Sequence, residues 1–402
     1  MNLSEHVKID TVYTRSINIE RDFDSEAIIG AYIPTSRAKL TLGRVAETLR
    51  SGDIPRAWAL IGPYGSGKSS FAMFLSHLLS DPLDNHTNAA KKVLRKADKG
   101  LYKIFLKYTT GGKGYLPVLL TGSPEPFAKR VAACLLDSVV KYWGNRRGPK
   151  PLIIKKLQSI ANQKEVTPKD IISVVEELQK KVAEGGGRGV VFVFDEFGKF
   201  LEYEARHYGA NDIYLLQLLA ELAKKGNEAN ILLFALMHQG FEQYAKGLGD
   251  NLRNEWAKIQ GRFENIPFLE TTEQTLRVLS SAFVKRFSKE QSDLVSKRCQ
   301  KIVKILYKQK ALPGTLDEKS ALEIFCKCYP LHPLSALLLP LLCSKMAQNE
   351  RTLFSYIGSK ESFGFRDRIN NIKDLRQWVF PWEIYEYFIL CGSLKNSSSA
   401  DL

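Results

Sequence analysis

The stretch "WALIGPYGSGKSSFAMFL", Trp58 to Leu75, determines the fold expected for this chain. It places an apolar run, a glycine-rich turn and a second apolar run one after another. Residues 62–69 match G-x-x-x-x-G-K-[ST], between a predicted strand (57–61) and a predicted helix from Lys68 to about Ser80. The pattern predicts a turn whose backbone N–H groups converge on phosphate oxygens beside the positive end of a helix.

The turn also predicts a role for each of its polar residues. Lys68 is expected to reach the β and γ phosphates of a bound nucleotide, and the Ser69 hydroxyl to bind Mg²⁺. A chance glycine turn before a capped helix is the alternative, and the flanking strand and helix disfavour it. The expected nucleotide-binding residues of the turn are Gly62, Pro63, Tyr64, Gly65, Ser66, Gly67, Lys68, Ser69 and Ser70.

A second apolar run, "VVFVFDEF" (190–197), ends in two carboxylates. A short continuous apolar strand of this kind is typical of a buried parallel sheet. It would deliver Asp195 and Glu196 at the carboxyl edge of the sheet, beside the phosphates. Asp195 is expected to hold Mg²⁺ through its water shell, and Glu196 to polarise the attacking water. The alternative is an acidic pair that only caps the next helix.

Short apolar strands alternate with helices up to residue 270, which predicts an α/β fold with a parallel sheet sandwiched by helices. After Glu270 the strand signals disappear and helical patterns continue to the end, so a domain boundary is expected there. The predicted strands are 57–61, 115–122, 190–196, 231–239 and 264–270.

The order of these features resembles the AAA+ and related STAND ATPases of the ASCE group of P-loop proteins. That resemblance implies a P-loop NTPase sheet followed by an all-α lid domain, with ATP and Mg²⁺ as cofactors and ATP hydrolysis as the activity. In those families a polar side chain at the end of the fourth strand senses the γ-phosphate. His238 and Gln239 end the run "ILLFALMHQ" here, and Gln239 is favoured. Each could equally be a satisfied polar residue at a strand end.

The resemblance implies two further site residues. Arg262 precedes the last predicted strand, where AAA+ proteins often carry an arginine finger that acts on a neighbour's nucleotide, so a homo-oligomer is expected. The alternative is a surface arginine at a helix end.

The passage Leu331-His332-Pro333 resembles the lid motif of STAND and origin-recognition-like ATPases, in which a proline lies close to adenine. This chain has His-Pro where the family has Gly-x-Pro; His332 could contact the nucleotide or be a buried, satisfied histidine.

Three domains are therefore expected. An N-terminal segment (1–55) packs on the ATPase core, the ATPase domain spans 56–270, and a helical lid or C-terminal domain spans 271–402. A basic, mostly helical insertion is expected near 85–113.

The chain of 402 residues carries 58 Lys and Arg against 43 Asp and Glu, a net charge of +15. Three segments concentrate this charge: 91–113 holds one acid, while 141–156 and 297–310 hold none. Interleaved Tyr and Trp make these segments candidates for contact with DNA or RNA. The alternative is a set of solvated helix faces.

The composition also bears on location and metal chemistry. The sequence has no apolar run of the roughly 18 residues that a membrane span needs, and residues 1–10 have no secretion-signal core. Six cysteines without disulfide-framework spacing suit a reducing interior, so a cytoplasmic protein without a membrane partner is expected. Zinc binding by Cys326, Cys328, His332 and Cys343 is disfavoured, because Cys-x-Cys is not the usual ligand spacing.

Three functions remain to be compared. The passages "HPLSALLLPLL" and "AQNERTLFSYI" resemble large ATPases of bacterial phage-defence loci, including BREX-type systems. The first candidate function is therefore an oligomeric AAA+-like ATPase of anti-phage defence or genome maintenance. It would act with nucleic acid or an effector protein. The second is a STAND-like switch that assembles an effector complex and hydrolyses slowly. A small-molecule kinase is third, since a water-polarising Glu196 is superfluous there.

Overall fold

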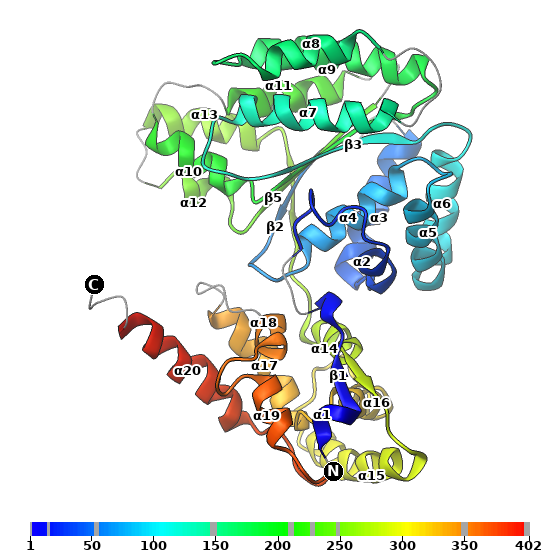
Figure 1. The fold of residues 1–402 in the computed structure, drawn as a ribbon, viewed down its shortest axis with the longest axis vertical. Coiled ribbons are helices and arrows are strands. Elements are labelled where there is room, and N and C mark those ends of the chain that lie inside the picture. Colours follow the sequence, from blue (N-terminus) through cyan, green and yellow to red (C-terminus); the bar gives the residue numbers. More distant parts are fainter. Residues whose placement is uncertain are drawn as a thin grey trace. The chain divides into compact units, whose positions relative to one another are not determined.

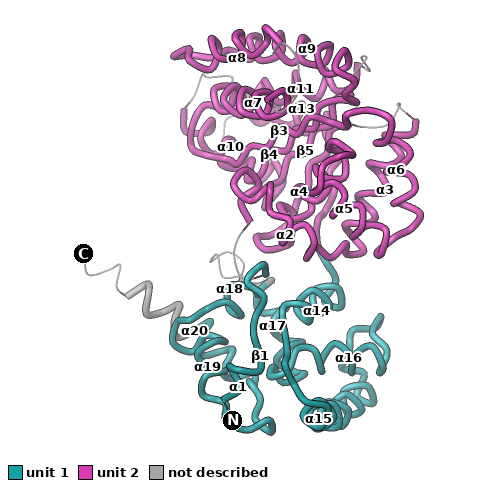
Figure 2. Tube along the Cα trace, turned by 45° about the vertical axis from the view of Figure 1, so that its right-hand side comes forward, with its two compact units in different colours: residues 1–16, 270–402 teal, residues 17–269 magenta. Residues whose placement is uncertain are grey.

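The structure is a computed structural model, and it describes residues 2–13, 17–51, 56–144, 151–207, 213–225, 230–246, 250–346 and 353–397. The chain divides into two compact units (Figures 1 and 2). Unit 2 comprises residues 17–269, and unit 1 comprises residues 1–16 together with 270–402. The N-terminal segment expected at 1–55 is thus divided between the units, since its first 16 residues belong with the C-terminal part of the chain.

Unit 2 is built on a five-stranded sheet in which every neighbouring pair is parallel, in the order β3-β4-β5-β2-β6. This confirms the expected α/β class with helices around a parallel sheet. Pro117 lies in β3, at an edge of the sheet, where a residue without an N–H is tolerated. The strands are β2 Ala57–Ile61, β3 Tyr115–Thr121, β4 Gly189–Asp195, β5 Asn230–Met237 and β6 Glu264–Pro267.

Helices cover both faces of the sheet, and alternate strand residues supply the two cores. In β4, Phe192 and Phe194 pack into one hydrophobic cluster, while Val191 and Val193 pack into the other. The first face carries α7 Phe127–Gly144, α8 Ile153–Ala161, α9 Pro168–Glu184, α10 Gly198–Arg206, α11 Tyr214–Lys224, α12 Phe241–Tyr244 and α13 Asp250–Gln260. The second carries α2 Glu26–Ala31, α3 Ser36–Ser51, α4 Lys68–Leu79, α5 Asn85–Ala97 and α6 Lys99–Thr109 (Figure 1).

The connections change from one side of the sheet to the other between β2 and β5. The chain leaves β2 into α4 on one face, whereas it leaves β5 into α12 and α13 on the other. Two neighbouring parallel strands whose connections run to opposite faces leave an opening at their carboxyl ends, and ligands of α/β proteins bind there. β4, which ends at Asp195, is the next strand beyond β5.

Unit 1 is mostly helical but also contains a small sheet. β1 (Val7–Ile9) pairs antiparallel with β7 (Phe283–Lys285), so the expectation of helices alone after residue 270 is wrong at these three residues. A strand of three residues is too short to show the alternation of apolar and polar residues by which strands are predicted, and its partner is more than 270 residues away in the sequence. Its helices are α1 Leu3–His6, α14 Thr272–Ser281, α15 Lys289–Lys308, α16 Glu318–Cys328, α17 Pro333–Met346, α18 Leu353–Gly358, α19 Phe365–Asn371 and α20 Pro381–Ser397.

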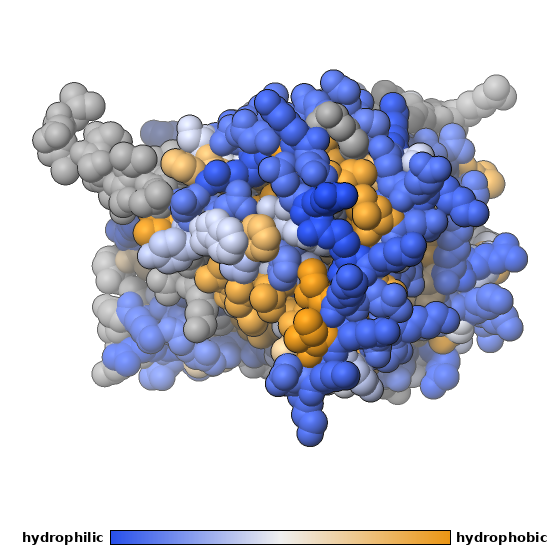
Figure 3. Space-filling model, turned by 90° about the horizontal axis from the view of Figure 1, so that it is seen from below, coloured by the Kyte–Doolittle hydropathy of each residue, from blue (hydrophilic) through white to orange (hydrophobic). Residues whose placement is uncertain are grey.

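Unit 1 presents large apolar side chains to solvent at helical spacing. Figure 3 shows hydrophobic side chains gathered among hydrophilic ones on one face of the molecule. Spacings of three and four residues place each exposed set on one side of its helix. On two of its helices the exposed residues are Leu334, Leu338 and Leu341 of α17, and Trp382, Tyr385 and Ile389 of α20.

Candidate functional site

The glycine turn, residues 62–69, connects β2 directly to α4. Gly65 and Gly67 have φ values of 75° and 84°, in the left-handed region that favours glycine. Gly67 is the N-cap of α4, so the helix begins at Lys68 and its first N–H groups lie at the end of the turn. The backbone therefore has the conformation expected of a phosphate-binding turn, and the N-terminus of a 12-residue helix directly follows it.

Gly62 marks a close approach between the turn and the strand on the other side of β2. A Cβ atom at this position would lie 2.3 Å from the main-chain oxygen of Phe268, which follows β6. The N–H of Phe268 in turn donates to the carbonyl oxygen of Ile61, the last residue of β2. Only glycine fits where the turn starts, because the main chain of Phe268 occupies the space of a side chain.

Lys68 is buried and points back over the turn. Its Nζ atom donates to the carbonyl oxygens of Gly62 and Pro63 at 2.6 and 2.9 Å, and it lies 3.2 Å from the Ser66 hydroxyl. Its side chain is only 9% exposed. Burial lowers the pKa of Lys68 to about 8, and the negative charges of Asp195 and Glu196 partly oppose this shift. The amine is thus a buried cation held at the turn by main-chain oxygens.

Asp195 lies at the end of β4 and is 4% exposed. Burial raises its pKa to about 6; a hydrogen bond with Ser69 lowers it, and the negative charge of Glu196 raises it further. The Oδ1 atom also accepts the Glu196 N–H at 2.9 Å. The structure therefore brings together the two residues predicted as Mg²⁺ ligands. A hydroxyl and a carboxylate side by side are the oxygen donors that Mg²⁺ prefers, so the residues present fit this ion.

Glu196 follows the strand in a strained conformation, with a φ of 49°. Its carboxylate forms an ion pair with Lys199, one turn along α10, and this contact raises the pKa of Lys199. The loop is tightly packed, since a Cβ atom at Gly122 would lie 2.2 Å from the Glu196 carbonyl oxygen. Lys199 is a partner of Glu196 that the sequence reasoning did not identify, although its i, i+3 spacing was visible.

β5 lies between the strand of the glycine turn and the strand of the two carboxylates, so its end faces both. The ring of His238 stacks on that of Tyr64, with centroids 5.0 Å apart. The Tyr244 hydroxyl lies 2.8 Å from His238 Nδ1, and burial lowers the pKa of His238. His238 is therefore linked directly to the turn. Gln239, the favoured residue from the sequence, is half-buried beside it.

Tyr244 was missed by the sequence reasoning. It comes from α12, and its hydroxyl lies so close to α10 that a Cβ atom at Gly198 would be 2.0 Å away. Burial raises the pKa of Tyr244, so the phenol remains neutral at physiological pH. The only sequence signal was the glycine two residues after Glu196.

Arg262 makes its visible contact within its own chain. It lies between α13 and β6, and its Nη2 atom is 3.0 Å from Glu221 Oε1 of α11. Glu221 also accepts a hydrogen bond from Gln217 at 2.9 Å. Pro333 belongs to unit 1, where it is the buried first residue of α17. The predicted residues that the structure groups around the turn are thus all from unit 2.

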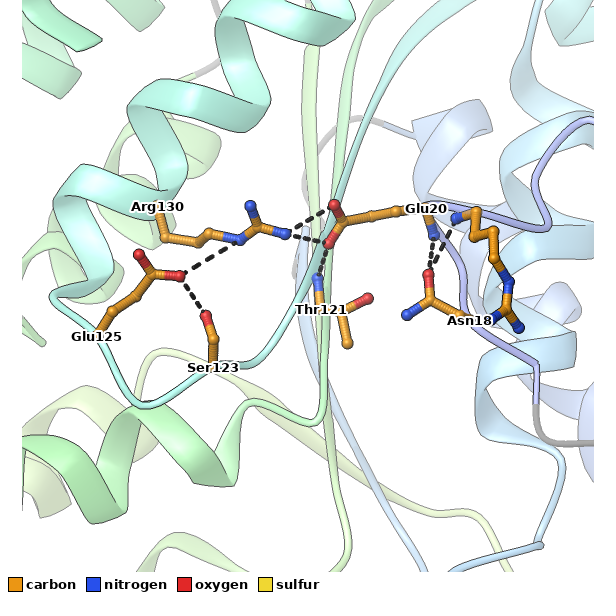
Figure 4. A network of polar contacts seen from close by, with 7 residues as sticks. Asn18, Glu20, Thr121, Ser123, Glu125 and Arg130 are labelled. Atoms are coloured by element: carbon orange, nitrogen blue, oxygen red, sulfur yellow. Dashed lines mark hydrogen bonds and ion pairs between the residues drawn. The ribbon is translucent and has the colours of Figure 1, made fainter. Parts of the chain in front are cut away.

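A polar network joins the start of unit 2 to the carboxyl end of β3 (Figure 4). Both carboxylate oxygens of Glu20 lie 2.7 Å from Arg130 Nη2 of α7, and Oε1 also accepts the Thr121 N–H at 2.6 Å. Asn18 holds the preceding turn by accepting the N–H of Glu20 at 3.1 Å. Thr121 pairs in register with Asp195, so this network supports the strand edge that carries the carboxylates.

The basic segments have mixed structural roles. In 91–113, helices α5 and α6 form as expected, but Lys91 is buried. In 141–156, residues 145–150 lie outside the described part of the chain, and Ile153 and Ile154 pack into the core. In 297–310, α15 carries Lys297, Lys301, Lys304 and Lys308 at helical spacing along one side. The α15 lysines are the most regular cationic surface among the three.

Neither metal clusters nor membrane helices are found where the structure describes the chain. Within the described residues, no group of three or more His, Cys, Asp or Glu side chains could hold a metal ion by itself. No described helix is long and apolar enough to cross a membrane. No protein-family model matches the sequence, and no curated protein matches it either.

Proposed function

We propose that this chain is a Mg²⁺-dependent ATPase of the P-loop type, with the AAA+/STAND arrangement that its sequence resembles. The observation that supports this best is the grouping of Lys68, Ser69 and Asp195 at the carboxyl edge of the sheet. The glycine turn ends in a helix N-terminus, its lysine is buried, and its serine is hydrogen-bonded to the carboxylate of β4. Each part is suited to a triphosphate and its magnesium ion.

The residues of this site would divide the work as follows. The main-chain N–H groups of the turn and Lys68 would bind the phosphates, and Ser69 and Asp195 would hold the ion. Bound Mg²⁺ supplies a positive charge that stabilises the phosphate oxygens during transfer. Glu196 would accept a proton from the attacking water, for which it must first part from Lys199. His238 or Gln239 would contact the γ-phosphate from β5, and His238 is already stacked on the turn.

The remaining parts of the proposal concern partners. We propose a cytoplasmic homo-oligomer in which Arg262 acts on a neighbour's nucleotide after leaving Glu221. Nucleic acid is the first candidate partner, because the α15 lysines form a cationic stripe to which a phosphate backbone would be attracted. Anti-phage defence or genome maintenance is the role that the resemblance favours.

A nucleotide switch that assembles an effector protein is the second candidate. The specific observation in its favour is the exposed apolar side chains on α17 and α20 of unit 1, the unit that would serve as the lid. Contiguous exposed apolar residues on neighbouring helices are typical of protein-binding surfaces. In this version hydrolysis is slow and resets the assembly.

One experiment tests the ATPase and separates the two versions. Phosphate release by the purified full chain is measured with and without Mg²⁺, and with duplex DNA, single-stranded DNA or RNA at two salt concentrations. Mg²⁺-dependent release that nucleic acid stimulates at low salt supports the first version. Slow release with ATP-dependent assembly in light scattering supports the second. Absence of both ATP binding and phosphate release would refute the ATPase.

A further inference from the structure

A cavity of about 520 Å³ opens in unit 1 beside β7, α15 and α16. Its lining carries three ammonium groups against one carboxylate; Lys327 forms an ion pair with that carboxylate, Glu323, so Lys285 and Lys319 give the cavity its net positive charge. The volume is sufficient for a small organic molecule. The polar lining residues that matter here are Lys285, Lys319, Lys327, Glu323, Ser296 and Cys326.

Two thiols meet at the wall of this cavity. Cys326 of α16 lines the cavity and is half-buried, whereas Cys299 of α15 is fully buried. The two side chains lie close enough to interact electrostatically, and Ser296 also interacts with Cys326. The Lys285 amine donates to the main-chain oxygen of Cys326, which fixes the residue from the β7 side. One thiol is thus accessible from the cavity, and a second, buried thiol neighbours it.

The surroundings also distinguish this thiol from the others. Hydrogen bonds from Cys299 and Ser296, together with the charge of Lys285, lower the pKa of Cys326 although burial opposes the shift. The same hydrogen bond and burial raise the pKa of Cys299. Burial raises the pKa of Cys134, Cys328 and Cys343 to about 12 in each case. Because the thiolate is the nucleophile, Cys326 is the most reactive of these five.

We propose that Cys326 is a modification site that undergoes thiol–disulfide exchange with a small anionic disulfide bound in this cavity, and that Cys299 is the resolving thiol. The lysines select the anion, and the contact between the two thiols makes the second step intramolecular. This chemistry lies within unit 1 and involves no residue of the glycine turn, so it stands apart from the proposed ATPase.

The exchange proceeds in two balanced steps. The Cys326 thiolate attacks one sulfur of the bound disulfide, the bond between its two sulfurs breaks, and one half leaves as a thiolate that takes up a proton from water. Cys299 then gives its proton to the second leaving thiolate as its sulfur attacks the mixed disulfide at Cys326. Two protein thiols are oxidised to a Cys299–Cys326 disulfide, and one external disulfide is reduced to two thiols.

The test uses the reduced full chain and oxidised glutathione, an anionic disulfide. After timed incubation, free thiols are alkylated and peptides are mapped by mass spectrometry. We expect Cys326 to be modified at least about tenfold faster than Cys134 or Cys343, and a peptide crosslinked between Cys299 and Cys326 to follow. In Cys299→Ser the glutathione adduct on Cys326 should persist without the crosslink, while Cys328→Ser should behave as the parent. Equal modification of all cysteines, or no adduct at Cys326, would overturn the proposal.

The role of the cavity charge is tested with a neutral reagent. Lys319→Ala removes one ammonium group from the cavity wall. It should slow the reaction of Cys326 with oxidised glutathione by about twofold or more, and leave the rate with neutral 2-hydroxyethyl disulfide unchanged. Equal slowing with both reagents would contradict selection of an anion.

Discussion

The side-chain amine of Lys68 donates a 2.6 Å hydrogen bond to the carbonyl oxygen of Gly62, which opens the same turn six residues earlier. The lysine and the first glycine therefore close the turn on itself. The Lys68 ammonium group is buried, and the acidic side chains that interact with it electrostatically are Asp195 and Glu196. A cation in this position has little solvation to lose when it meets an anion, so phosphate binding would gain most of the electrostatic attraction.

Lys68→Ala should abolish nucleotide binding. The variant removes the one buried cation of the turn, and we expect the affinity for a fluorescent ATP analogue to fall by about two orders of magnitude or more. Lys103→Ala, which removes the same charge from the exposed side of α6, should retain the affinity. Micromolar binding by the Lys68 variant would contradict the assigned phosphate contact.

Two glycine substitutions should have opposite effects on stability. Gly62→Ala places a Cβ atom 2.3 Å from the Phe268 oxygen, so the free energy of unfolding should fall by about 1–3 kcal/mol and nucleotide binding should weaken. Gly43 lies in α3, and a Cβ atom there would meet nothing within 4 Å beyond the adjoining helix backbone. Gly43→Ala should therefore raise the free energy of unfolding by up to about 1 kcal/mol. Urea unfolding of the two variants measures both. Equal stability of the two variants would show that the main chain of Phe268 leaves room for the new Cβ atom.

Asp195→Asn should stabilise the protein in a pH-dependent manner. The pKa of Asp195 rises from 3.8 to about 6 on folding, so the protonated group favours the folded state below pH 4, and that stability is lost as the pH rises through 6. The free energy of unfolding of the variant should therefore match that of the parent near pH 4. Above pH 6 it should exceed that of the parent by on the order of 1–3 kcal/mol. Thermal unfolding across this range measures the difference. A constant difference at all pH values would contradict the buried, ionised carboxylate.

Glu196→Gln should bind ATP with unchanged affinity and fail to hydrolyse it. An amide keeps the shape of the side chain but cannot accept the proton of the attacking water, so turnover should fall by about two orders of magnitude or more. Glu202→Gln makes the same chemical change at an exposed position of α10, and it should retain turnover. Near-normal hydrolysis by the Glu196 variant would remove its assignment as the base.

Arg262→Ala should depress hydrolysis only where molecules assemble. Loss of its exposed ion pair with Glu221 should change stability by less than about 1 kcal/mol. Turnover per molecule should fall at high protein concentration and match the parent on dilution. Glu221→Gln, which releases the arginine, should leave assembled turnover intact or raise it. A loss that is the same at every concentration would argue against action on a neighbour.

Much of unit 2 could be predicted because its signals are local. The strand at Ala57–Ile61, the helix from Lys68 and the strand expected at 190–196 each lie in a single short run of sequence. All three are present, the last shifted by one residue to Gly189–Asp195. Thr167 and Asp170 form the capping box at the start of α9, as the residue types indicate. Such features depend on neighbours within a few residues, which a sequence displays directly.

The contacts around the site were harder to predict because they are made across the sheet. The stacking of Tyr64 on His238 and the hydroxyl of Tyr244 beside it join three separate segments. The Glu20 carboxylate reaches Arg130, 110 residues later. Its charge alone makes the segment 141–156 a candidate for nucleic-acid contact, yet Ile153 and Ile154 within it form part of the core. Periodicity would have identified that helix; the polar partners depend on the tertiary fold.

The pairing of β1 with β7 has a consequence for how the molecule is made. Val7 lies opposite Lys285, so β1 is synthesised long before its partner strand: the 273 residues from 10 to 282, which include all of unit 2, are translated in between. Unit 2 holds every strand of its own sheet within one continuous span and can complete its core first. Unit 1, by contrast, needs both β1 and residues after 270, so deleting β1 would damage a unit whose residues 270–402 are translated more than 260 positions later.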